Sequence, residues 1–71
     1  MISERLGKLV DEMVDKGVHF EDAVQEFEKQ FISRVLGGCD GCLVKTADAL
    51  GIHRNTLARK MHAYKIKRRT G

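Results

Sequence analysis

The stretch that decides the fold is KTADALGIHRNTLARKMHAYK, residues 45–65. Apolar residues recur at helical spacing on both sides of its glycine, which predicts two short helices over 43–50 and 54–64. Gly51 can adopt the positive φ of a tight turn, and Ile52 is placed to fill the angle between the helices. Two short helices joined in this way are typical of a helix-turn-helix.

The second of these helices has two chemically different faces. Leu57, Met61 and Tyr64 lie at i, i+4 and i+7 and should point inward. The opposite arc is mostly polar or basic, and its members are Asn55, Thr56, Arg59, His62 and Ala63, flanked by Arg54 and Lys60. Arg, Asn and Thr side chains on one exposed helix can contact base edges in a major groove. We therefore expect Arg54, Asn55, Thr56 and Arg59 to contact bases.

The distribution of charge supports an anionic partner. The chain has 13 Lys+Arg and 10 Asp+Glu, which gives a net charge of +3. Residues 1–36 are net acidic, whereas residues 53–71 contain basic side chains and no Asp or Glu. A solvated face needs no single sign of charge, but a phosphate-binding face does. The predicted phosphate contacts are Lys45, Lys60, Lys65, Lys67, Arg68 and Arg69.

The first half of the chain predicts two further helices. One follows Ser3 and ends at Gly17, and the next runs from about Phe20 to the glycines at 37 and 38. Both have apolar stripes, and the second stripe is broader than one partner helix requires. This pattern predicts a homodimer whose interface contains Leu6, Leu9, Met13, Val24, Phe27, Phe31 and Val35.

The fold class expected from these segments is all-α with four helices. We divide one compact domain into dimerisation helices over 1–38 and a DNA-binding helix-turn-helix unit over 39–71. With 71 residues, the chain buries only about 60% of the surface that its unfolded form exposes. A second copy would supply the missing core, and the ends at Met1 and Gly71 favour a whole small protein over a fragment.

Several other classes of protein are disfavoured. The chain has no apolar run long enough to span a bilayer, and its first residues do not resemble a signal peptide, so we expect a cytoplasmic protein. It shows no paired carboxylates, nucleophile–base pair or Gly-rich phosphate loop, so we expect no enzyme and no cofactor.

The segment GCLVKTADALGIHRNTLARKMHAYKI, residues 41–66, resembles the C-terminal helix-turn-helix of the Fis family, which includes the NtrC-type domains of bacterial activators. The matching positions are Gly41, Ala47, Leu50, Gly51, Ile52, Arg54, Thr56, Leu57 and Lys60, with Met61 in place of Leu. The resemblance implies a bacterial, nucleoid-associated homodimer that regulates transcription or bends DNA. It also implies base or phosphate contacts by His53, Arg54, Thr56 and Arg59, and a backbone contact by Lys60.

Three positions depart from the family pattern. Cys42 stands where an Asn usually caps the third helix, and cysteine is a poor cap. Thr46 replaces the first of two alanines, which predicts looser packing there. Ala58 lacks the basic side chain that some members have, which weakens any contact at that position.

Cys39 and Cys42 form a C-x-x-C sequence and leave alternatives open. A thioredoxin-like redox motif would need a preceding strand, and a structural zinc site would need four ligands. We interpret them as two ordinary thiols in a loop, with a thiol- or metal-responsive protein as one alternative function. A helical bundle that binds an acidic protein partner is the other alternative.

Overall fold

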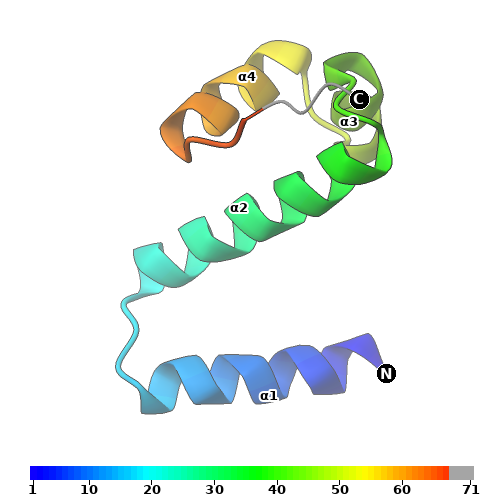
Figure 1. Cartoon of the computed structure of the whole chain (residues 1–71). Coiled ribbons are helices and arrows are strands. Elements are labelled where there is room, and N and C mark those ends of the chain that lie inside the picture. Colours follow the sequence, from blue (N-terminus) through cyan, green and yellow to red (C-terminus); the bar gives the residue numbers. More distant parts are fainter. Residues whose placement is uncertain (68–71) are drawn as a thin grey trace.

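The computed structural model describes residues 1–67, which are helical and contain no strand. The helices are α1 (Ile2–Asp15), α2 (Phe20–Gly38), α3 (Leu43–Leu50) and α4 (Arg54–Ala63), arranged as in Figure 1. The predicted all-α class and four helices are confirmed. The predicted bounds of the third helix are also confirmed, and the fourth ends one residue earlier than expected.

The core joins α2, α3 and α4. Ile32 and Leu36 from the second half of α2 are buried with Ala47 of α3, and with Leu57 and Met61 of α4. Side chains that are partly buried against this cluster are Leu43, Leu50, Ile52, Tyr64 and Ile66. The helix-turn-helix and the second half of α2 therefore form one folded unit with a shared core.

The N-terminal half of the molecule contributes little to that core. No residue of α1 is buried, and α1 and α2 diverge from the short connection at 16–19 (Figure 1). A groove of about 570 Å³ lies between them, and its apolar lining includes Leu6, Leu9, Met13, Val24 and Phe27. Five of the seven predicted interface residues thus line one groove; Phe31 is exposed and Val35 half-buried.

Each helix ends in the same hydrogen-bonded arrangement, in which one residue with positive φ turns the chain. Gly17 and Gly51, both with φ of 73°, occupy this position after α1 and α3, as the sequence predicted. The predicted end of the second helix at Gly37 and Gly38 is confirmed, because α2 runs from Phe20 to Gly38. Neither glycine takes the positive φ, however; Asp40, with φ of 54°, turns the chain after the C-cap residue Cys39.

Packing explains where α2 ends. Leu36 is buried in the core, so the helix must continue through its last turn before the chain can reverse toward α3. The Gly41 N–H then bonds the Leu36 carbonyl at 3.0 Å, and the Asp40 N–H bonds the Gly37 carbonyl at 3.3 Å. Tertiary contacts outweigh the modest helix-breaking preference of glycine.

None of the helices within residues 1–67 is long and apolar enough to cross a membrane.

Candidate nucleic-acid interface

The start of α3 accommodates both departures at Cys42 and Thr46. Cys42 is the N-cap residue and its side chain makes no capping hydrogen bond, as expected for cysteine. Thr46 is fully buried, and its Oγ1 donates to the Cys42 carbonyl at 2.7 Å. The expectation of looser packing at Thr46 is therefore wrong, because the hydroxyl has a partner and the side chain fills its space.

The turn between α3 and α4 fixes the angle between these two helices. The Gly51 N–H bonds the Asp48 carbonyl at 3.2 Å, and the Ile52 N–H bonds the Ala47 carbonyl at 3.1 Å. Ile52 is half-buried and packs against the core, as the sequence predicted. The turn thus presents the first residues of α4 at the surface.

His53 caps α4, a role that the sequence did not predict. It has extended backbone (φ −71°, ψ 146°), and its Nδ1 accepts a hydrogen bond from the Asn55 N–H at 3.0 Å. Histidine is absent from the usual set of N-cap residues, so only its position directly before the predicted helix could have indicated this role. With Nδ1 as acceptor, the neutral ring carries its proton on Nε2, which remains a donor.

We expect His53→Ala to lower the free energy of unfolding by about 1 kcal/mol, because Ala cannot accept the Asn55 N–H. His53→Asn keeps a side-chain acceptor and should retain most of the stability. Urea unfolding of both variants measures the difference. Equal losses in the two variants would show that the His53 cap does not stabilise α4.

The outward face of α4 has the exposure that base contact requires. His53, Arg54, Asn55 and Arg59 are exposed and Thr56 is half-buried. Leu57 and Met61 lie buried on the opposite side of the same helix. Among the predicted phosphate contacts, Lys45, Lys65 and Lys67 are exposed, whereas Arg68 and Arg69 lie outside the described residues.

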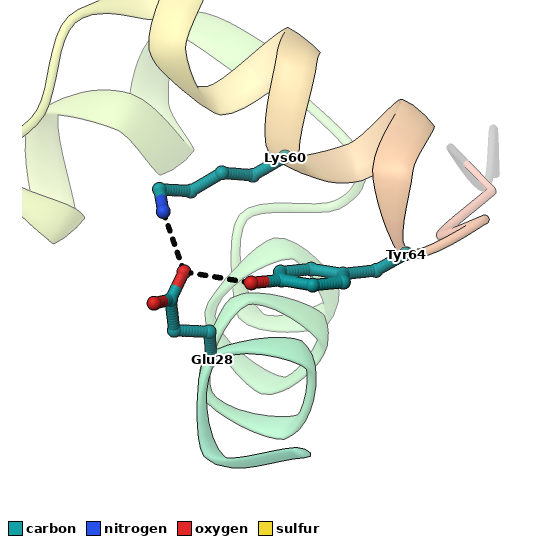
Figure 2. Close-up of polar contacts among 3 residues, drawn as sticks. All are labelled: Glu28, Lys60 and Tyr64. Carbon is teal, nitrogen blue, oxygen red and sulfur yellow. Dashed lines mark hydrogen bonds and ion pairs between the residues drawn. The ribbon is translucent and has the colours of Figure 1, made fainter. Parts of the chain in front are cut away.

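The structure pairs Lys60, one of the predicted phosphate contacts, with a carboxylate of α2. Its Nζ donates to Glu28 Oε1 at 2.5 Å, and this is the only salt bridge within residues 1–67. Tyr64 Oη donates to the same oxygen at 3.0 Å, so one carboxylate of α2 holds two side chains of the α4 segment (Figure 2). The partner of Lys60 lies 32 residues earlier in the chain, beyond the reach of local sequence patterns.

The three groups change one another's ionisation. The hydrogen bond from Lys60, followed by that from Tyr64, lowers the pKa of Glu28 below its ordinary value. The bond to Glu28 raises the pKa of Lys60. Burial, followed by the bond to Glu28, raises the pKa of Tyr64. Glu28 and Lys60 are therefore charged together at neutral pH, and the cluster fixes α4 against α2.

We expect Glu28→Gln to lower the free energy of unfolding by about 1 kcal/mol at neutral pH, where the charged pair is intact. A lowered pKa in the folded state stabilises the protein above the unfolded value, and this contribution is lost as the pH falls through the folded pKa. The difference between wild type and variant should therefore shrink as the pH falls below 4.5, the ordinary value for Glu28. Urea unfolding across the acid range measures it, and a difference independent of pH would contradict the role of the Glu28 charge.

The described residues contain no candidate metal site and leave three basic side chains of the helix-turn-helix without an acidic partner. Within residues 1–67, no three His, Cys, Asp or Glu side chains come together in a way that could hold a metal ion. Arg54 and Arg59 on α4, and Lys45 on α3, have no carboxylate partner in this part of the chain. Exposed basic side chains also occur on α1 and α2, but only the segment from residue 53 onward combines them with a complete absence of Asp and Glu.

Comparison with known proteins agrees with this geometry. The family model described as bacterial regulatory protein, Fis family, matches residues 23–64, more than half of the 71-residue chain. The match contains nearly all of α2 and the whole of α3 and α4, the elements that build the core. No curated protein and no solved structure gives a significant match. From the extent of the family match and the helix-turn-helix that it spans, the chain belongs to the Fis family of bacterial regulatory proteins.

Proposed function

We propose that this protein is a homodimeric transcriptional regulator that inserts α4 of each protomer into the major groove of DNA. The observation that carries the proposal is the outer face of α4, on which Arg54, Asn55 and Arg59 are exposed and no carboxylate neutralises the two arginines. In helix-turn-helix proteins, the N-terminal residues of the second helix reach base edges. The protein acts through binding and performs no reaction.

The side chains divide into two groups by what they contact. Residues at the start and along the outer arc of α4 contact base edges: His53, Arg54, Asn55, Thr56 and Arg59. Lysines and arginines around this arc neutralise phosphates: Lys45, Lys65, Lys67, Arg68 and Arg69. Lys60 leaves the second group, because Glu28 already holds its ammonium. Its role is to position α4 on α2.

Apolar surface on α1 and α2 supports the dimer. Leu9 is 57% exposed, Phe27 is 53% exposed and Phe31 is 50% exposed in the single chain. Large contiguous apolar patches are uncommon on monomeric soluble proteins and mark association sites. Pairing two copies along this face would bury both patches and place two copies of α4 on one DNA molecule. A bacterial cytoplasm, with DNA as the partner, is the location that fits this role.

The test selects the binding site of the wild type from random DNA and then compares how well the wild type and an Arg54 variant discriminate between that site and altered sites. We expect Arg54→Ala to lose about 1–3 kcal/mol of discrimination at one base pair of each half-site, because bidentate contacts from arginine specify guanine. Competition gel shifts with matched and singly mismatched duplexes measure this. Unchanged discrimination would remove Arg54 from the base-contacting group.

The exposed apolar face also favours a second candidate function. A helix from another protein could pack on α1 and α2 in place of a second copy, which would make the chain a protein-interaction module. If the wild type fails to shift any duplex at low salt while remaining folded, that function replaces DNA binding.

A further inference from the structure

Cys39 and Cys42 stand at the two ends of the turn that joins α2 to α3. Cys39 is the C-cap residue of α2, and Cys42 is the N-cap residue of α3. The Cys42 N–H donates to the Cys39 carbonyl at 3.0 Å, so the four residues form one closed turn. The two cysteines are therefore fixed relative to each other by the backbone.

The geometry of this turn brings the cysteines within reach of each other. Its central residues, Asp40 and Gly41, both have positive φ, at 54° and 78°. The end residues of a hydrogen-bonded β-turn have Cα atoms less than about 7 Å apart. Disulfides usually join Cα atoms about 4.4–6.8 Å apart. The reduced protein thus already holds Cys39 and Cys42 at about the separation that a disulfide needs.

Both thiols are reduced and partly exposed to solvent. Each cysteine is half-buried, and neither forms a disulfide in the structure. The side chain of Cys42 makes no capping hydrogen bond to α3. Within residues 1–67 no third metal-binding side chain joins them, so the geometry gives no support to a zinc site at this turn.

We propose that Cys39 and Cys42 are a thiol–disulfide exchange site that closes the α2–α3 turn covalently when it is oxidised. The oxidant is a low-molecular-weight disulfide of the glutathione type. One cysteine thiolate attacks a sulfur of this disulfide, forms a mixed disulfide and releases one small thiol. The second thiolate then attacks the protein sulfur of the mixed disulfide and releases the other small thiol. Two protein thiols become one disulfide, and two electrons reduce the oxidant to two thiols.

The new bond would join the helix that bears the apolar face to the first turn of the helix-turn-helix. Thr46 already anchors the Cys42 carbonyl through its Oγ1, so the start of α3 need not move when the sulfurs join. The disulfide restricts the unfolded chain while preserving the native turn, and oxidation should therefore stabilise the protein. This inference does not depend on DNA binding.

The test uses the full-length protein equilibrated in buffers of reduced and oxidised glutathione. In oxidising buffer we expect a mass loss of two hydrogen atoms per chain, no retained glutathione and a melting temperature raised by at least about 5 °C. A dithiol reductant should reverse all three changes. The matched controls are Cys39→Ser and Cys42→Ser, each of which should retain one glutathione and gain no stability.

Three outcomes would overturn the proposal. Glutathione could remain on both cysteines of the wild type, which would show that the thiols cannot reach each other. Oxidation could link separate chains on a non-reducing gel and leave no internal disulfide. The internally oxidised protein could also melt at a lower temperature than the reduced protein, which would show that the native turn does not accommodate the bond.

Discussion

Phe27→Glu is expected to convert the protein from dimer to monomer and to abolish measurable binding to its selected DNA site. Phe27 is 53% exposed in the single chain and its ring lies 5.5 Å from that of Phe31, so the two aromatics form one apolar surface beside the α1–α2 groove. Burying a Phe side chain contributes about 1.5–3 kcal/mol, and a dimer buries two copies. Losing both, and burying two carboxylates, should raise the dimer dissociation constant at least about a thousandfold.

Light scattering at micromolar concentration measures this change directly. Phe27 lies outside the core, so circular dichroism should show an unchanged helical content and confirm that the variant is folded. Val44→Glu is the matched control, because Val44 is 56% exposed but lies on α3, away from the α1–α2 face. A dimeric Phe27→Glu variant, or a monomeric wild type, would contradict the proposed interface.

Loss of the dimer should remove DNA binding because each protomer presents only one α4. Two connected recognition helices bind two half-sites with an effective concentration set by the dimer geometry, and a monomer loses this advantage. The Glu28–Lys60–Tyr64 cluster matters for the same reason. It ties α4 to α2, which carries the apolar face, so in the proposed dimer it would help to set the separation of the two half-sites.

The helix-turn-helix was largely predictable from sequence because its determinants are local. The spacing of Leu57, Met61 and Tyr64 identifies the buried side of α4, and Gly51 marks the turn before it. The residue that turns the chain after α2 was not predictable in this way. Its position depends on Leu36 entering a core built from α3 and α4, and a non-glycine residue, Asp40, takes the positive φ.

The pairing of Lys60 with Glu28 could not be predicted from the sequence for a related reason. Charge patterning assigns a lysine on a basic helix to DNA, and it cannot distinguish a side chain aimed at solvent from one aimed at a carboxylate on another helix. Glu28 belongs to the acidic half of the chain, which composition alone separates from the DNA-binding half. The cluster shows that the two halves meet at α2 and α4.

The association constant for DNA is expected to fall steeply with salt. Lys45, Lys65 and Lys67 are exposed, and in the proposed dimer they would make six phosphate contacts. Each contact contributes about −0.9 to the slope of log K against log salt, so these six predict a slope of at least about −5 and a loss of more than about a thousandfold between 50 and 200 mM salt. Fluorescence anisotropy with a labelled duplex measures the slope, and a flat titration would contradict phosphate binding by this surface.

Two single substitutions test the proposal that Lys45 binds phosphate and Lys60 does not. Lys45→Gln should reduce the magnitude of the slope by about 2, because a dimer loses two contacts. Lys60→Gln removes the same charge from the same helix-turn-helix, but Glu28 holds that ammonium, so the slope should stay within about 0.5 of wild type while the free energy of unfolding falls. If the two variants reduce the slope equally, Lys60 leaves Glu28 for a phosphate in the complex, and the cluster must then open when α4 enters the groove. The relative slopes therefore decide whether Glu28 holds α4 rigidly on α2 or releases it to DNA.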